Sequence, residues 1–186
     1  LDDQTVTVTT TDNDTAAFTL GAITGPVSEG ATTATFTVVL GAQPDSDVVI
    51  SVISGDEGEA TVDAAELTFT NGNWSNAQTV TVTGVDDNLV DGSVNTTITM
   101  SVKDASSDNN FDALDDQTVT VTTTDNDTAA FIKSKTAVTV TEAGAGNTAT
   151  FTVVLGAQPD SNVVISVTSG DACLLYTSDA ADDLLC

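Results

Sequence analysis

The amino-acid sequence repeats itself, and this repetition constrains the fold more than any other feature. Residues 1–18, LDDQTVTVTTTDNDTAAF, recur without a change at residues 114–131. Residues 34–50 return at residues 149–165 with one substitution, offset by two further positions. Near-identity at this level is typical of long arrays that stack one domain many times. The unit to be explained is therefore the repeat.

The repeat boundaries divide the chain into four segments. Residues 1–14 match the end of the full copy, so we expect them to be the last strand of a preceding repeat. One complete repeat is expected at residues 15–127, and a truncated next repeat at residues 128–172. The match to the first copy stops after Asp171, so residues 173–186 need a separate explanation.

The last segment, CLLYTSDAADDLLC, resembles the translation of a transposase adapter used in preparing sequencing libraries. Ten consecutive residues, from Cys173 to Asp182, fit one reading frame of that adapter. We expect this tail to be non-native, and we exclude it from fold reasoning as one excludes other such scars.

The composition removes most catalytic chemistry. The chain has no His, and both of its Cys residues lie in the C-terminal tail. An imidazole base, a catalytic triad, a disulfide framework and an ordinary zinc site all need these side chains. Paired acids can hydrolyse glycosides, but sugar sites usually need aromatic platforms, and aromatic residues make up 4% of the chain. We therefore expect no enzyme activity.

The charge is strongly one-sided. The chain has 28 Asp or Glu residues against 3 Lys or Arg residues, a formal net charge of −25. Nucleic acids and anionic membrane surfaces bind proteins through Lys and Arg, so neither is an expected partner. The sequence has no run of about 18 apolar residues, so we expect no direct membrane insertion by this segment. The expected counter-ions are cations.

Apolar residues alternate with Thr or Ser in nearly every segment. Phe36, Val38 and Leu40, for example, are separated by Thr37 and Val39 and preceded by Thr35. A period of two with β-branched residues on both faces indicates β-strands. We expect an all-β fold, an immunoglobulin-like Greek-key β-sandwich of about seven strands in tandem repeats. The expected strands lie near residues 18–23, 35–40, 48–53, 66–70, 79–83, 97–102 and 118–122.

The acidic residues gather in turns, whereas the outward strand positions carry Thr and Ser. Asp is a common turn residue, so isolated acids need no further explanation. Adjacent acids are different, because two carboxylates about 4 Å apart repel by about 4 kcal/mol at an effective dielectric constant near 20. Oxygen donors without nitrogen or sulfur favour calcium. The acidic turns contain Glu29, Asp56, Glu57, Asp86, Asp87, Asp91, Asp115, Asp116, Asp125 and Asp127.

Three motifs in order along the chain resemble the Calx-beta domain. They are VSEG at residues 27–30, GVDDNLVDG at residues 84–92 and VTVTTTDND at residues 119–127. The resemblance covers residues 15–127. The family is known from sodium–calcium exchangers and many large bacterial surface proteins. The resemblance implies a seven-stranded sandwich that binds calcium at one end, between the loops and the closing strand.

The resemblance also implies a set of ligands, with the carbonyl of Leu89 as a further donor. Two departures from the family pattern argue for fewer ions or weaker binding. Val94 stands where the family usually has an acid, and the stretch before Asp63 is about one residue short. Calcium sites of about 10⁻⁴ to 10⁻³ M are normal for extracellular modules. The acids placed around Ca²⁺ are Glu29, Asp63, Asp86, Asp87, Asp91, Asp125 and Asp127.

We expect a calcium-binding structural or adhesive repeat of a long bacterial protein, with calcium rigidifying the junction between copies. The expected partners are neighbouring repeats, and a cell-surface or matrix ligand through other domains. The resemblance and the absence of Cys before residue 173 favour an extracellular or cell-surface location. One alternative is a calcium-sensing regulatory Calx-beta module of a membrane protein, and near-identical serial copies disfavour it. Another is an inert acidic stalk, which would spread its acids over the outward strand positions.

Overall fold

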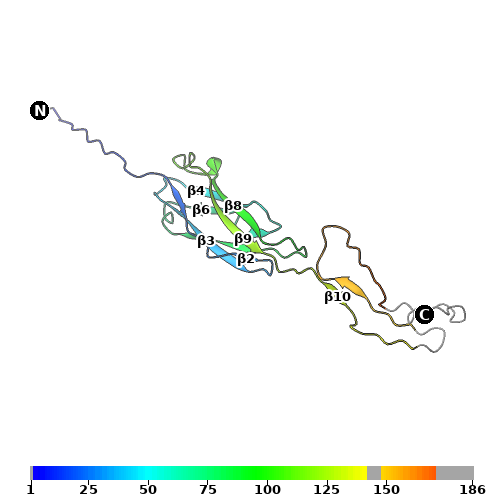
Figure 1. Ribbon diagram of the computed structural model, residues 1–186. Helices are drawn as coiled ribbons and strands as arrows, with labels where there is room; N and C mark the ends of the chain where they lie inside the picture. The colour runs from blue at the N-terminus through cyan, green and yellow to red at the C-terminus, as the bar shows by residue number, and fades with distance from the viewer. Residues whose placement is uncertain (1, 142–147, 171–186) are drawn as a thin grey trace. The chain divides into compact units, whose positions relative to one another are not determined.

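The computed structural model describes residues 2–141 and 148–170 (Figure 1). Within these residues no helix is long and apolar enough to cross a membrane. The chain forms two compact units, and the predicted tail at residues 173–186 lies outside the described residues. The first unit comprises Leu1–Asp87 and Asp91–Asn126, and the second comprises Asn88–Val90 and Asp127–Cys186.

One sheet of the first unit has four antiparallel strands. Their order across the sheet is β1, β3, β7, β5. Alternate residues point inward, as the period of two predicted, so that β3 reads as buried at every second position. The strands are β1 (Phe18–Leu20), β3 (Thr33–Leu40), β5 (Ala60–Val62) and β7 (Gln78–Gly84).

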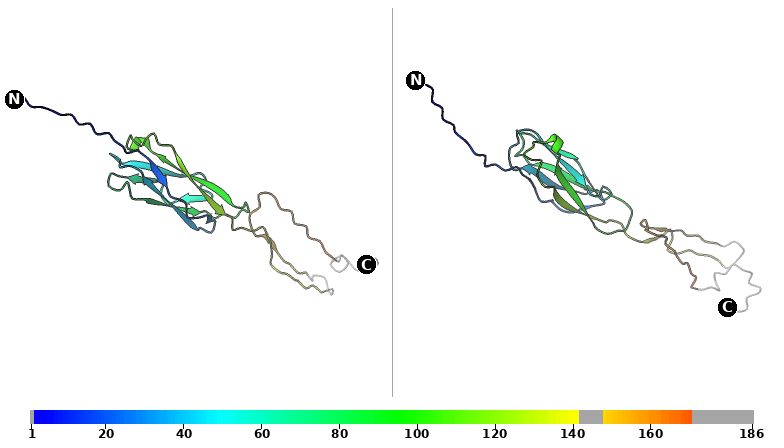
Figure 2. Two further views of the ribbon diagram at one scale, coloured as in Figure 1. Left: turned by 60° about the vertical axis from the view of Figure 1, so that its left-hand side comes forward. Right: turned by 90° about the horizontal axis from the view of Figure 1, so that it is seen from above.

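The other sheet of the first unit has five strands in the order β2, β9, β8, β4, β6. All neighbours are antiparallel except β2 and β9, which run parallel. Figure 1 shows β8 and β9 side by side, and Figure 2 shows the two layers from two further directions. The strands are β2 (Val27–Ser28), β4 (Val48–Ser54), β6 (Glu66–Phe69), β8 (Val94–Val102) and β9 (Gln117–Thr124).

A hydrophobic core fills the space between the two sheets. It is built from the inward positions of both sheets, together with residues of the loop before β9, and this confirms the predicted all-β, immunoglobulin-like β-sandwich. Thr residues face outward in cross-strand pairs, such as Thr35 opposite Thr81. The largest fully buried apolar side chains are Phe36, Phe69, Phe111, Ile50, Ile98 and Met100.

The predicted strands are confirmed, with two additions and one shorter strand. The sequence did not predict β2 and β5, because two or three residues are too few to show a period. The first predicted strand, at residues 18–23, ends at Leu20. Beyond it the backbone still contacts β3, since Gly21 donates its N–H to the Thr37 carbonyl at 2.8 Å.

One buried carboxylate organises the end of the sandwich at which the chain enters β1. Asp108 follows the short 3-10 helix η1 (Asp104–Ser106) and is 5% exposed. Its carboxylate accepts backbone N–H groups from Asn110 at 2.9 Å, Asp45 at 2.6 Å and Ser46 at 3.2 Å. These hydrogen bonds hold the pKa of Asp108 below its ordinary value, and the bond from the Asn110 N–H has the largest effect.

The second unit repeats the beginning of the first. Strands β10 (Phe131–Lys133) and β11 (Val153–Leu155) pair antiparallel with Phe131 opposite Leu155. The same register joins Phe18 to Leu40 in the first unit, as identical sequence should. The second unit begins at Asp127, directly after Asn126 of the first. The sequence did not predict that residues 88–90 join this unit.

Candidate metal centre

Glu29 is positioned by the short strand β2. Its N–H donates to the Thr124 carbonyl at 3.2 Å, and the Thr124 hydroxyl donates to the Val27 carbonyl at 3.2 Å. Gly84, at the end of β7, leaves room for this crossing, because a Cβ there would collide with the carbonyl of Ser28. The close approach of β2 to β7 and β9 therefore fixes where Glu29 enters the site.

The closing segment after β9 is held by side chains and backbone of the surrounding turns. Asp125 accepts the N–H of Gly92 on its Oδ2 at 2.9 Å. Asn126 donates its backbone N–H to Glu29 Oε2 at 3.1 Å and its side-chain Nδ2–H to Asp86 Oδ1 at 3.0 Å. Asn126 thus bridges two predicted ligands.

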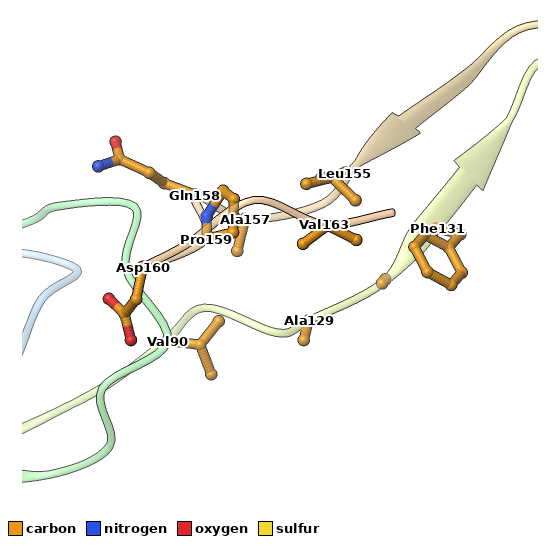
Figure 3. Close-up of a pocket in the computed structure, with 10 residues that line it drawn as sticks. Val90, Ala129, Phe131, Leu155, Ala157, Gln158, Pro159, Asp160 and Val163 are labelled. Atoms are coloured by element: carbon orange, nitrogen blue, oxygen red, sulfur yellow. The ribbon is translucent and has the colours of Figure 1, made fainter. Parts of the chain in front are cut away.

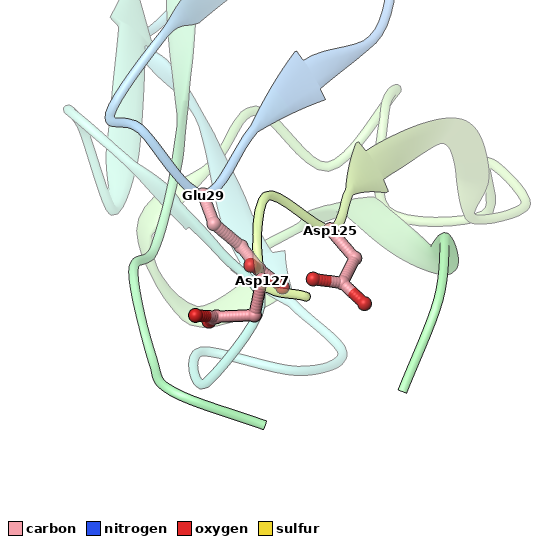
Figure 4. Close-up of side chains that lie close together, drawn as sticks. All are labelled: Glu29, Asp125 and Asp127. Atoms are coloured by element: carbon pink, nitrogen blue, oxygen red, sulfur yellow. The ribbon is translucent and has the colours of Figure 1, made fainter. Parts of the chain in front are cut away.

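Three of the predicted ligands converge at this end of the sandwich. Glu29, Asp125 and Asp127 each offer one carboxylate oxygen, and these oxygens all lie within 4.8 Å of one another. Figure 4 shows the three side chains, with Glu29 coming from the turn after β2 and the two Asp residues from the segment after β9. We call this group the carboxylate cluster. It could hold a metal ion, and its oxygen donors suit a hard cation.

The surroundings of Glu29 disfavour its charged form. The side chain is 2% exposed, and this burial raises its pKa. The N–H of Asn126 acts in the opposite direction, but the charges of Asp125, Asp87 and Asp91 raise the pKa further. A cation in the cluster would reverse this balance, because it stabilises every carboxylate near it.

The sequence did not single out Glu59, which belongs to the same acidic surroundings. Burial is the largest cause of its raised pKa, and the charges of Asp91, Asp56, Glu29 and Asp87 raise the pKa further. Its carbonyl accepts the N–H of Val85 at 2.9 Å, so the residue is tied to the turn that carries the acidic pair. The only sequence signal was its position directly before β5, a strand too short to be predicted.

The remaining predicted ligands fall into two groups. Asp87 and Asp91 lie near enough to raise the pKa of Glu29, and Asp86 is joined to the cluster through Asn126. Asp63 lies elsewhere. It follows β5, and its Oδ1 accepts the N–H of Thr81 at 2.8 Å, an ordinary bond between a side chain and the backbone. Its role as a ligand stays a prediction that this geometry does not favour.

A hollow of about 500 Å³ in the second unit has a different character (Figure 3). Its lining is mainly apolar and includes Phe131 and Val163. The same sequence positions in the complete repeat are Phe18 and Val48, which are core residues 2% and 0% exposed. The hollow is therefore part of the core space of a repeat, and we assign no chemistry to it.

The fold and the site together define an immunoglobulin-like β-sandwich with a carboxylate cluster at one end. No protein-family model matches the sequence, and no curated protein matches it. The structure is similar to that of the Escherichia coli chaperone DraB, with 8% identity, a TM-score of 0.39, and coverage of 61% of this chain and 56% of DraB. The aligned part thus spans little more than half of DraB.

The comparison also found similarity to two further structures. One is the Salmonella enterica SafA pilin in complex with the SafB chaperone, with 8% identity, a TM-score of 0.39, and coverage of 60% of this chain and 54% of the other. The second is SSP-19 of Caenorhabditis elegans, described as an MSP-domain protein like family member, with 15% identity, a TM-score of 0.34, and coverage of 54% and 92%. At these identities and TM-scores the likeness carries no argument about this chain.

Proposed function

We propose that the repeat binds calcium at the carboxylate cluster and is a non-enzymatic structural or adhesive unit of a long extracellular or cell-surface protein. The observation that carries the proposal is the convergence of Glu29, Asp125 and Asp127, whose oxygens lie within 4.8 Å of one another. The resemblance of residues 15–127 to the Calx-beta domain supports it independently, since the family pattern names the same three acids.

The donor set favours calcium over other cations. Calcium accepts six to eight oxygen ligands in irregular geometry, whereas magnesium demands near-ideal octahedral geometry and keeps several of its waters. The acids around the cluster, Asp86, Asp87 and Asp91, offer further carboxylate oxygens near it. With 3 basic against 28 acidic residues, the chain itself supplies few cations to balance them.

Calcium would act on the joint between repeats. Asp125 follows β9 directly, and the chain continues through Asp127 into the next copy. An ion held by these acids and Glu29 would neutralise their repulsion and fix the path of the closing segment. Serial copies stiffened in this way make a spacer whose length depends on calcium, and the neighbouring repeats are its first partners.

The proposal is tested by calorimetry and thermal melts of the 186-residue chain. We expect calcium to bind, and the double change Asp86→Ala with Asp87→Ala to remove most of the binding. The double change Asp115→Ala with Asp116→Ala is the matched control, because it removes the same charge from another exposed turn. Equal calcium binding in the two double variants would refute the assignment.

The melts separate specific binding from charge screening. An ion that binds only the folded state stabilises it by about 1.4 kcal/mol per site when its concentration is tenfold above Kd. For a domain of this size that raises the melting temperature by a few degrees. Magnesium at matched ionic strength should do less. Equal melting temperatures in chelator, magnesium and calcium would favour the inert acidic stalk.

A further inference from the structure

The turn Gly-Ala-Gln-Pro occurs in both copies and holds the entering chain in the same way each time. In the first unit Gly41 donates its N–H to the Ala17 carbonyl at 2.8 Å, and in the second Gly156 donates to the Ala130 carbonyl at 2.8 Å. A Cβ on either glycine would lie 3.2 Å from the side chain of that alanine. The segment that enters each repeat is therefore held against the turn by the same hydrogen bond and the same close contact in both copies.

In the first unit this turn lies beside an acidic triplet. A hollow of about 370 Å³ is lined by Asp12 and Asp14 together with Gln43, Asn110 and Leu114. Residues 12–14 are identical in sequence to residues 125–127, the closing triplet of the repeat. In an array, the surface around Gln43 would therefore face the closing triplet of the preceding copy.

The second unit contains the same turn in contact with another acidic loop. Gln158, which corresponds to Gln43, donates its backbone N–H to the Asn88 carbonyl at 2.7 Å. Leu89 and Gln158 also form a parallel bridge. Residues 88–90 directly follow Asp86 and Asp87, so the turn pairs with the backbone of the loop that carries the acidic pair.

We propose that the Gly-Ala-Gln-Pro turn of each repeat, with the loop around Asn110, is the docking surface for the acidic end of the preceding repeat. The backbone of the turn pairs with the loop that follows Asp86 and Asp87 of the preceding repeat. The surface around the turn covers the closing triplet of that repeat, residues 125–127. The partner is thus an adjacent copy of the same repeat. The backbone pairing needs no ion. Only the statement that the turn docks beside a calcium site rests on the proposed function.

The chemistry of the receiving surface fits this partner. The residues that line it opposite Asp12 and Asp14 are uncharged, although the whole chain carries a net charge of −25. The side-chain amide groups of Gln43 and Asn110 each have two N–H donors, and one is used within the repeat: Gln43 donates to the Asn71 carbonyl at 3.1 Å, and the Asn110 side chain bonds to Asp108. The second donor suits a carboxylate acceptor. Like charges at this position would repel the preceding copy. An uncharged patch facing the acidic triplet would give the array its direction.

The test uses the 15N-labelled 186-residue chain in chelator and in calcium. Gln158→Pro removes the N–H that bonds to Asn88, whereas Gln158→Ala keeps it. Gln43→Pro is the matched control, because it makes the same change in the other copy. We expect the Gln158 amide of the unmodified chain to exchange at least tenfold more slowly than an exposed amide. We expect Gln158→Pro alone to shift the signals of residues 88–90.

Two results would overturn the docking surface. One is a Gln158 amide that exchanges at the rate of an exposed amide in both solutions, a measurement that needs no variant. The other is a set of signals for residues 88–90 that Gln158→Pro leaves unchanged while the signals of residues 131–133 show β10 intact. If the pairing is present but calorimetry detects no calcium, the docking surface stands and the proposed calcium function fails.

Discussion

Two buried carboxylates of the first unit, Glu29 and Asp108, are held in opposite ways. Asp108 accepts three backbone N–H groups, and its pKa is lowered. Glu29 accepts one, from Asn126, and faces other carboxylates, so its pKa is raised. The first carboxylate is satisfied by the protein, and the second has surroundings in which a cation or a proton would be favourable. Both carboxylates are buried, so burial does not distinguish them. Their hydrogen-bond donors and neighbouring charges do.

We predict that Glu29→Gln stabilises the ion-free protein at pH 7 and removes most of the stabilisation by calcium. The raised pKa of Glu29 means that the folded state binds the proton more tightly than the unfolded state does. Its contribution to stability is therefore present below the ordinary pKa near 4.5 and is lost as the pH rises through the folded pKa. Gln keeps an acceptor for Asn126 but carries no charge. Thermal melts between pH 4 and 8, with chelator and with calcium, measure both effects.

Asp108→Asn is predicted to destabilise the protein at neutral pH, with or without calcium. The lowered pKa means that this carboxylate stabilises the fold above its ordinary value of 3.8, and that the contribution is lost as the pH falls through the folded pKa. The difference between the variant and the unmodified chain should therefore shrink below about pH 4. Denaturant unfolding at pH 7 and pH 3 measures it. A constant difference at both values would contradict the account.

At the scale of elements, the site depends on one close crossing. Strand β2 has two residues, yet it sets the position of Glu29 by pairing with β9 and passing over Gly84 of β7. The strand contributes little hydrogen bonding of its own. Packing against two longer strands stabilises it, and the absence of a side chain at Gly84 permits that packing.

Gly84→Ala should therefore destabilise the sandwich and weaken calcium binding together. The added Cβ would meet the backbone of Ser28, which can move only by displacing β2 and Glu29. Overpacking of this kind costs about 1–3 kcal/mol. Gly25→Ala is the control, because a Cβ there has no atom within 4 Å. Chemical denaturation and calorimetry of both variants decide the point, and equal behaviour would show that the crossing is not tight.

At the scale of the whole molecule, the side chains of the repeated segment are buried in the first unit and exposed in the second. Phe18 is 2% exposed in the first unit, and its counterpart Phe131 is 60% exposed in the second. Phe36 is 1% exposed and Phe151 is 44% exposed. The local register is the same in both units, so the difference comes from the strands that complete the core of the first.

Limited proteolysis with an enzyme that cleaves after aromatic residues should cut the chain at Phe131 and Phe151 well before Phe18 and Phe36. The flanking sequences are nearly the same, so the comparison isolates burial from sequence preference. Local opening is needed for cleavage inside the first unit and is rare there. Mass spectrometry of early fragments measures the order. Equal rates at the paired sites would mean that the first unit is no more stable than the second.

Much of the fold could be predicted from the sequence because burial in a sandwich leaves a period of two. Most strands, the two-sheet class and the gathering of Glu29, Asp125 and Asp127 followed from pattern and resemblance. Strand β2 could not be predicted, because its pairing partner lies 96 residues away, as from Val27 to Thr123, and two residues show no period. Glu59 was missed and Asp63 falls outside the cluster for a related reason. Spacing along the chain does not fix which side of a short strand faces the carboxylate cluster.

The repeated segment separates what sequence determines from what tertiary structure decides. Residues 114–127 include strand β9, where Val121 is 1% exposed, whereas the identical residues 1–14 form no strand in their described part, and Val8 is 81% exposed. The amino-acid sequence determines the alternation of apolar and polar residues, the charge and the positions of the acids. They do not supply the β8 backbone that pairs with β9, or the opposite sheet that covers Val121. A strand exists only when another segment satisfies its N–H and C=O groups and buries one face, so only the tertiary structure decides which copy folds.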